Sequence, residues 1–161
     1  MAKFVSEKIR MKSAARLAAV QATYMIAYGQ IPVDEAIKDF VNGEVGRYLL
    51  ADNSEGGEET VAVEPMDKTY FEKLVRGVHQ NKEDLEKSLN LFFAEGRNLE
   101  RCDGTMRALL LCAMYEIVNT RDVDAKVIIQ EYVDMAYAFF SKSEPKMVNA
   151  LLDQIARQIR E

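Results

Sequence analysis

Four cationic side chains lie close together near the start of the chain and could contact phosphate groups. They are Lys8, Arg10, Lys12 and Arg16, and an alanine-rich stretch follows them. Ammonium and guanidinium groups neutralise nucleic-acid phosphates, so this stretch indicates a nucleic-acid contact. The alternative is the solvated side of a core helix, which is the commoner role of such clusters.

No group of residues has the spacing of a catalytic or metal site. The chain has no common nucleotide-binding, nucleophile-elbow or zinc-protease motif. His79, the single histidine, could act as a general base, but no nucleophile or paired acid stands at a suitable spacing, which favours a structural or surface role. Cys102 and Cys112 form no CxxC pair and are interpreted as reduced packing residues. The sequence therefore predicts a protein that is not an enzyme and that uses no metal or cofactor.

Charge is distributed unevenly along the chain. Residues 1–16 carry five cations and one acid, a net charge of +4, whereas the other 145 residues carry 16 cations and 25 acids, a net charge of -9. A protein that coats nucleic acid without specificity would be basic throughout. The asymmetry instead indicates a small, directed contact that a basic partner could complete.

Composition and length are those of one globular domain that stays in the cytoplasm. The 161 residues are 48% hydrophobic and 29% charged, which is ordinary for such a domain. No run of eighteen apolar residues could span a membrane, and the first twelve residues lack the apolar stretch of a secretory signal. We therefore expect a cytoplasmic protein without a membrane contact.

Apolar residues recur every three to four positions, the pattern of helices with one buried face. Seven segments show it: 7–28, 33–50, 70–78, 85–93, 106–117, 127–140 and 147–155. The segment 106–117 is apolar on nearly every side, which predicts a central helix. Asp124 is predicted to be an N-cap, and Gly96 to end the fourth helix. With no strand predicted, the fold class is all-α: a compact single domain of about seven helices over residues 1–161.

The stretch 51–64 is the one long segment without helical periodicity. It contains five acids, no cation and the pair Gly56-Gly57. These features predict a mobile acidic loop, either a solvated linker or a regulatory contact.

Four motifs in this order resemble the NusB family of transcription antitermination factors. They are ARLAAVQATY near the start, AMYEI in the predicted central helix, VIIQEYVDMAYAFF, and KMVNALLD near the end. The resemblance covers residues 12 to about 155. It implies a NusB-like helical RNA-binding domain that works with ribosomal protein NusE. The two proteins would bind single-stranded boxA-type RNA within the RNA polymerase antitermination complex and promote transcription of ribosomal RNA operons.

The resemblance also implies which residues bind RNA and partner. Lys12 and Arg16 would hold phosphates, and Gln21 and Tyr24 fall on matching positions of the same motif. Lys126 and Lys146, at the starts of the last two helices, would extend the RNA track, although isolated lysines are more often plain surface charge. The partner surface is expected at the turn before the central helix and along that helix, at Glu100, Arg101, Met106, Arg107 and Glu116.

The chain departs from the family pattern at several positions. Lys12, Ser13 and Ala14 stand where the family often has consecutive arginines, which lowers the cationic density. Leu111 replaces an arginine of the central motif, and Gln130 replaces an asparagine.

These departures leave two other hypotheses open. One is a protein-interaction module or homodimer that has lost RNA recognition. The other is the RNA-binding module of an RNA methyltransferase, which would need a separate catalytic domain.

Overall fold

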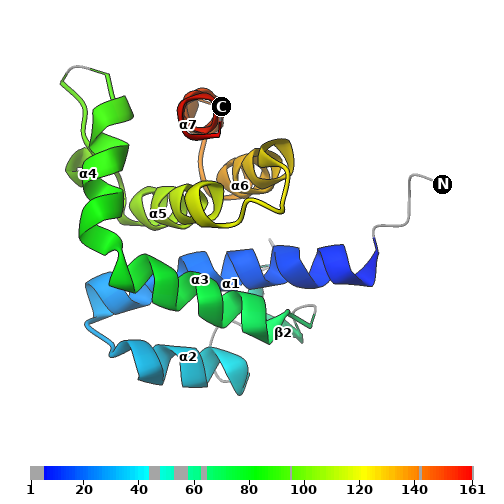
Figure 1. The fold of residues 1–161 in the computed structure, drawn as a ribbon. Coiled ribbons are helices and arrows are strands. Elements are labelled where there is room, and N and C mark those ends of the chain that lie inside the picture. The colour runs from blue at the N-terminus through cyan, green and yellow to red at the C-terminus, as the bar shows by residue number, and fades with distance from the viewer. Residues whose placement is uncertain are drawn as a thin grey trace. The chain divides into compact units, whose positions relative to one another are not determined.

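The computed structural model describes residues 6–43, 48–52, 58–62, 65–94, 96–141 and 143–160, and of the segments 48–52 and 58–62 it describes the backbone. The chain divides into two compact units, one up to Val75 and the other from Arg76 on. Figure 1 shows the elements along the chain. Among the described residues there are seven α-helices, which confirms the predicted fold class and number of helices.

The first unit is built on two helices and the start of a third. Helix α1 spans Glu7–Gly29, α2 spans Val33–Val41, and α3, Lys68–Gln80, crosses the boundary between the units. The hydroxyl of Ser6 caps α1 by accepting a hydrogen bond from the backbone N–H of Ile9 at 3.2 Å. The rings of Phe40 in α2 and Phe71 in α3 are stacked with centroids 5.5 Å apart, so α2 and α3 share an aromatic contact.

Residues 48–62 contain a feature that was not predicted. Strand β1, Tyr48–Asp52, pairs antiparallel with β2, Glu58–Ala62, with Tyr48 opposite Ala62. The prediction that the chain has no strand is therefore wrong. Neither short segment alternates apolar and polar residues, so the sequence carried no signal for their pairing.

Two predicted boundaries in this region change accordingly. The second helix ends at Val41 and does not continue to Leu50, because Gly43 follows with a φ of 83° that a right-handed helix excludes. The predicted acidic loop 51–64 overlaps the hairpin at residues 51–52 and 58–62, and its other residues lie outside the described part of the chain.

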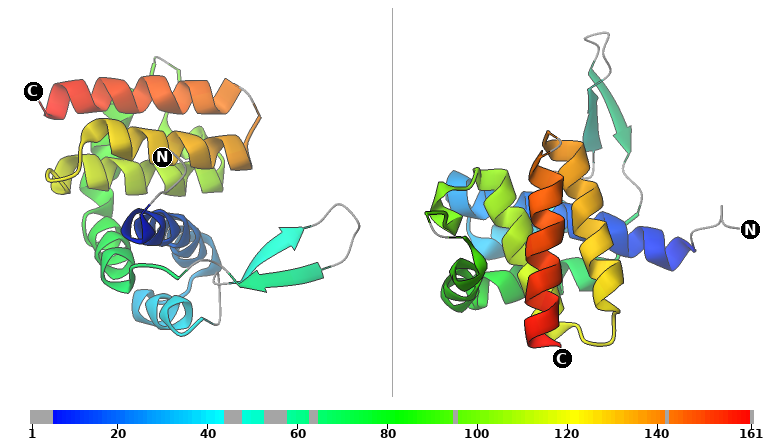
Figure 2. Two further views of the ribbon diagram at one scale, coloured as in Figure 1. Left: turned by 90° about the vertical axis from the view of Figure 1, so that its right-hand side faces the viewer. Right: turned by 90° about the horizontal axis from the view of Figure 1, so that it is seen from above.

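The second unit is a layered set of helices. Helix α4 spans Lys82–Phe92, a short 3-10 helix η1 spans Leu99–Arg101, and α5, α6 and α7 span Gly104–Asn119, Ala125–Phe139 and Ser143–Ile159. Figure 2 shows α5, α6 and α7 side by side, and each of the three contacts the other two.

Helix α5 is the buried element of this unit. It contacts α4, α6 and α7, and all its side chains from Ala108 to Ile117 are buried, which confirms the prediction of a central helix. At Gly77 of α3, an added Cβ atom would collide with the ring of Tyr115. The end of α3 can therefore lie close to α5 because residue 77 has no side chain.

Helix ends in this unit are capped by side chains. The carboxylate of Asp124 accepts a hydrogen bond from the N–H of Lys126 at 3.1 Å, as its predicted N-cap role requires. At the C-terminal end of α5, the guanidinium of Arg160 donates to the carbonyl oxygens of Ile117 at 2.9 Å, Thr120 at 2.8 Å and Val123 at 2.6 Å. This guanidinium satisfies acceptors that a helix end leaves unpaired. Gly96, predicted to end α4, lies in the following loop with a φ of 86°, because α4 ends at Phe92.

Candidate nucleic-acid interface

One face of α1 carries the predicted cations Lys12 and Arg16, and the ring of Tyr70 in α3 covers it. The Lys12 ammonium lies 5.1 Å from the centroid of this ring, and the Arg16 guanidinium carbon lies 5.3 Å from it. Nη2 of Arg16 also donates to the Tyr70 hydroxyl at 3.4 Å. The electron-rich ring face attracts both cations, so Tyr70 holds the two side chains against the protein.

Backbone contacts fix the start of α3 against α1. The N–H of Asp67 donates to the carbonyl oxygen of Met11 at 3.0 Å, and the Asp67 carboxylate accepts from the N–H of Tyr70, also at 3.0 Å. Because Asp67 bonds to both elements, the ring of Tyr70 is positioned over this face of α1.

The two predicted phosphate ligands differ in exposure. Arg16 is only 2% exposed, whereas Lys12 is half-buried. A phosphate ligand has to reach solvent, and Arg16 does not do so in this conformation. Its visible role is to bind Tyr70.

The opposite face of α1 is accessible and carries different chemistry. At about 100° per residue, Gln21 lies about 180° from Lys12 around the helix axis, while Arg10, Tyr24 and Tyr28 lie within about 60° of Gln21. Arg10 is exposed and Gln21 is half-buried. Tyr24 is 41% exposed and Tyr28 is 49% exposed. This set, Arg10, Gln21, Tyr24 and Tyr28, is called the outer face of α1 below.

Gln21 has an unsatisfied polar atom on this face. Its Oε1 atom is buried and has no hydrogen-bond partner among the residues that the structure describes. A buried acceptor without a donor costs free energy, so the amide would gain if it turned outward to a ligand that donates to it. An RNA contact of Gln21, which the resemblance to the family implies, stays a prediction, and the structure places this residue on the outer face.

The two lysines predicted to extend the RNA track are both in the second unit. Lys126 is exposed in the first turn of α6, and Lys146 is exposed in the first turn of α7. Both ammonium groups can reach solvent. A role in RNA binding stays a prediction for each of them.

The predicted partner residues fall into an accessible group and a buried group. Glu100 and Arg101 are exposed in η1. Arg107, in the first turns of α5, is half-buried and donates to the carboxylate of Glu86 in α4 at 2.8 Å. These three side chains could meet a partner at the start of α5.

Met106 and Glu116 belong to the buried group, with exposed fractions of 3% and 0%. The carboxylate of Glu116 accepts a hydrogen bond from the hydroxyl of Tyr132 in α6 at 2.6 Å. Leu111, which replaces the family's arginine, is 2% exposed. Most of α5 is therefore buried, and of the predicted partner residues on this helix Arg107 alone is accessible.

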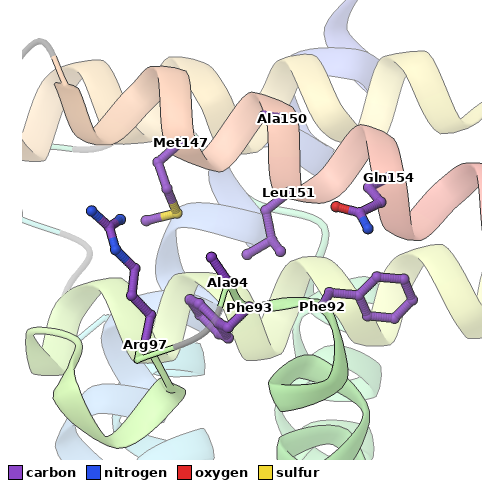
Figure 3. Close-up of a pocket in the computed structure, with 8 residues that line it drawn as sticks. All are labelled: Phe92, Phe93, Ala94, Arg97, Met147, Ala150, Leu151 and Gln154. Carbon is purple, nitrogen blue, oxygen red and sulfur yellow. The ribbon is translucent and has the colours of Figure 1, made fainter.

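An open pocket lies between the end of α4 and one side of α7, as Figure 3 shows. Its free volume, open solvent included, is about 450 Å³. Met147 and Ala150 of α7 lie on its wall. The full lining consists of Phe92, Phe93, Ala94, Arg97, Met147, Ala150, Leu151 and Gln154.

Sequence reasoning missed three residues that shape these surfaces. Tyr70 and Glu86 are remote in sequence from the cations that they contact, so no local pattern could reveal them. Tyr28 did have a signal, since it follows Tyr24 by one helical turn, but that spacing is equally typical of a buried stripe.

His79 is exposed at the end of α3, in agreement with its predicted surface or structural role. Cys102 is half-buried, and this burial raises the pKa of its thiol.

Comparison with known proteins agrees with the motifs in the sequence. Transcription antitermination protein NusB of Rhodopseudomonas palustris strain HaA2 is 37% identical over 154 residues, which cover 96% of this chain and 86% of the relative. The protein of the same name from Rhodospirillum rubrum is 38% identical over 155 residues, covering 92% and 84% of the two chains. That from Maricaulis maris is 37% identical over 153 residues, covering 95% and 90%.

The fold agrees as well. The solved structure of T. maritima NusB superposes with a TM-score of 0.69 at 20% sequence identity, over 90% of this chain and 89% of the other. The model of the NusB family matches residues 13–157, which include α1 from its second turn on and all of α2 to α6. With relatives above 35% identity along nearly the whole chain, the protein belongs to the NusB family.

Proposed function

We propose that this chain is a nonenzymatic transcription antitermination factor of the cytoplasm. In this proposal it binds boxA-type single-stranded RNA together with ribosomal protein NusE, within an RNA polymerase antitermination complex on ribosomal RNA operons. The observation that carries the proposal is the outer face of α1, where a cation, an amide and exposed aromatic rings share one side of a helix. The names of the relatives support the same activity.

Each kind of group on this face suits single-stranded RNA. The guanidinium of Arg10 can neutralise a phosphate, and the amide of Gln21 can both donate to and accept from a base or sugar. The exposed ring of Tyr24 offers a surface on which a base can stack. Lys12, half-buried beside Tyr70, adds positive charge near the start of the helix.

A basic partner is needed because the chain itself has few accessible cations at this site. Lys8, Arg10 and Lys12 would neutralise about two to three phosphates, which gives weak binding at physiological salt. The acidic remainder of the chain, with a net charge of -9 beyond residue 16, favours a basic protein. We place the contact with NusE at Glu100, Arg101 and Arg107, the accessible members of the predicted partner set.

Arg16 has a different role in this proposal from the one that the family motif implied. Its guanidinium is buried against Tyr70, so it positions the covering ring. Reversing its charge would place an unpaired carboxylate in the interior and unfold the region, which would say nothing about RNA.

The direct test is fluorescence anisotropy of a labelled boxA-like RNA at near-physiological salt, with the protein alone and with NusE. We expect tight binding only when both proteins are present, and a steep loss of affinity with rising salt. Arg10→Glu and Lys12→Glu should each weaken binding and make the salt dependence shallower, by roughly 0.7 in log-log slope for each phosphate that is no longer neutralised.

The matched control is Lys38→Glu, which makes the same charge change at an exposed position on α2. It should leave RNA binding unchanged apart from a small long-range effect of charge. If the two proteins form a complex that binds no RNA, the proposal is wrong and the chain is a protein-interaction module. If the protein instead self-associates and ignores both RNA and NusE, the homodimer hypothesis replaces it.

A further inference from the structure

At the C-terminal end of the outer face of α1, the solvent-exposed rings of Tyr24 and Tyr28 are in contact. Their ring centroids are 4.9 Å apart, and the ring planes are inclined by 35°. Of the other tyrosines whose side chains the structure describes, Tyr70, Tyr115 and Tyr132 are at most 9% exposed, whereas Tyr137 on α6 is also exposed, at 58%. Tyr24 and Tyr28 therefore form an aromatic pair that the fold leaves uncovered.

We infer that Tyr24 and Tyr28 act together as a stacking platform for two bases of the bound RNA, so that the RNA track continues to the C-terminal end of α1. This inference rests on the proposed function and adds Tyr28 to it. It also states how the bases are held.

The spacing of the rings decides the mode of stacking. A base inserted between two rings needs them about 7 Å apart, twice the ordinary contact distance of about 3.5 Å. The observed 4.9 Å leaves no room for it. The bases must therefore lie on the outer sides of the pair, one against Tyr24 and one against Tyr28.

The pair is continuous with the polar part of the same face. Tyr28 lies within about 20° of Gln21 around the helix, and Arg10 is about 20° from Gln21 as well. From Arg10 to Tyr28 the helix advances about 27 Å. RNA along this line would meet a cation first, then the unsatisfied amide of Gln21, and finally the aromatic pair.

The two ends of this track should respond differently to salt. Phosphate contacts at Arg10 release counterions, so they make binding salt-dependent. Base stacking on tyrosine releases none and tolerates any base, because every base has an aromatic face. Removal of a tyrosine ring should therefore shift the affinity equally at all salt concentrations.

The experiment measures binding of boxA-like RNA to the complex with NusE for Tyr28→Ala, Tyr24→Ala and Tyr28→Phe. Stacking on one aromatic side chain is worth about 1 to 3 kcal/mol, so each alanine variant should bind roughly 5-fold to 150-fold more weakly with an unchanged salt slope. Tyr28→Phe keeps the ring and should bind like the wild type. Tyr137→Ala removes a tyrosine that is even more exposed from another helix, and it should also bind like the wild type.

A second arm identifies the stacked base. RNA variants that lack one base at a time are titrated against the wild type and against Tyr28→Ala. At one position, removing the base should weaken wild-type binding while leaving Tyr28→Ala unaffected, because the stacking partner is already gone. The chain has no tryptophan but seven tyrosines, so the difference in quenching of tyrosine emission by RNA between the wild type and Tyr28→Ala reports the same contact.

The outcomes separate this inference from the proposed function. If the wild-type complex binds no RNA, both fail. If it binds RNA and Tyr28→Ala binds equally well while circular dichroism shows an intact fold, the stacking platform alone is wrong. If Tyr28→Ala no longer binds NusE but still binds RNA, the pair is a protein contact and the inference is overturned.

Discussion

The two units each bury one charged side chain against a tyrosine hydroxyl, but the pairs differ in chemistry. In the first unit the guanidinium of Arg16, 2% exposed, donates to Tyr70 at 3.4 Å and also lies over its ring. In the second unit Tyr132 donates to the carboxylate of Glu116 at 2.6 Å, and both residues are fully buried. The arginine meets an acceptor and a ring face, whereas the carboxylate depends on donors.

The difference shows why charged residues in a family motif need not be binding residues. In sequence, Arg16 looked like a phosphate ligand and Glu116 like a partner contact. Burying a charged group without a hydrogen-bond partner costs free energy. Each of the two side chains therefore forms a hydrogen bond with a tyrosine from another helix. The hydrogen bond between Tyr132 and Glu116 is the shorter of the two, and its residues are the more deeply buried. We therefore expect it to contribute more to stability.

The largest effect is expected for Tyr132→Phe. This change deletes the hydroxyl that donates to Glu116 and deprives a buried carboxyl of that donor. We expect the free energy of unfolding to fall by about 1.5 to 3 kcal/mol, the range for hydrogen bonds to charged groups. Urea denaturation followed by circular dichroism measures it. A decrease below about 0.5 kcal/mol would mean that other contacts already satisfy Glu116.

A smaller decrease in stability is expected for Arg160→Met. This variant tests whether the C-terminal end of α5 depends on the hydrogen bonds that Arg160 donates. Methionine keeps most of the side-chain volume but removes the donors to Ile117, Thr120 and Val123. Because residue 160 is half-buried, water can replace part of these bonds, and we expect the free energy of unfolding to fall by about 1 to 2 kcal/mol. Hydrogen exchange should show faster opening of the last turn of α5. Unchanged hydrogen exchange in that turn would show that the hydrogen bonds of Arg160 are not needed to hold it.

Tyr70→Phe is the counterpart of Tyr132→Phe in the first unit and should cost less than about 1 kcal/mol. The bond to Arg16 is long, and the phenyl ring still faces the cations of Lys12, Arg16 and Lys73. The ratio of the two Tyr→Phe effects, measured under the same conditions, is the useful quantity. If Tyr70→Phe cost as much as Tyr132→Phe, the contrast between the pairs would disappear.

The smallest effect is expected for the ion pair of Arg107 and Glu86, which is neither buried nor fully exposed. Its side chains are 24% and 22% exposed, so solvent screens the attraction. A double-mutant cycle with Arg107→Ala and Glu86→Ala should give a coupling energy of about 0.2 to 1 kcal/mol that decreases with added salt. A coupling above about 2 kcal/mol would place this pair with the buried ones.

The sequence alone determined the helices, the central position of α5 within its unit, and the family. Helical periodicity, the Asp124 cap and the apolar run of 106–117 depend on residues a few positions apart, which a sequence displays directly. Prediction from the sequence failed where an element depends on residues that are distant along the chain. Strands β1 and β2 form only by pairing with each other, and the second helix ends at Val41, before Gly43 and short of the end of its apolar pattern.

Only the tertiary structure decided which charged residues are accessible. Lys12 and Arg10 are two residues apart and look equivalent in sequence, yet Tyr70 covers the first and the second is exposed on the outer face with Tyr24 and Tyr28. Likewise Glu116 is internal while Glu100 is exposed. The physical reason is that local sequence fixes the direction in which a side chain leaves its helix, but burial depends on which distant elements pack against that side.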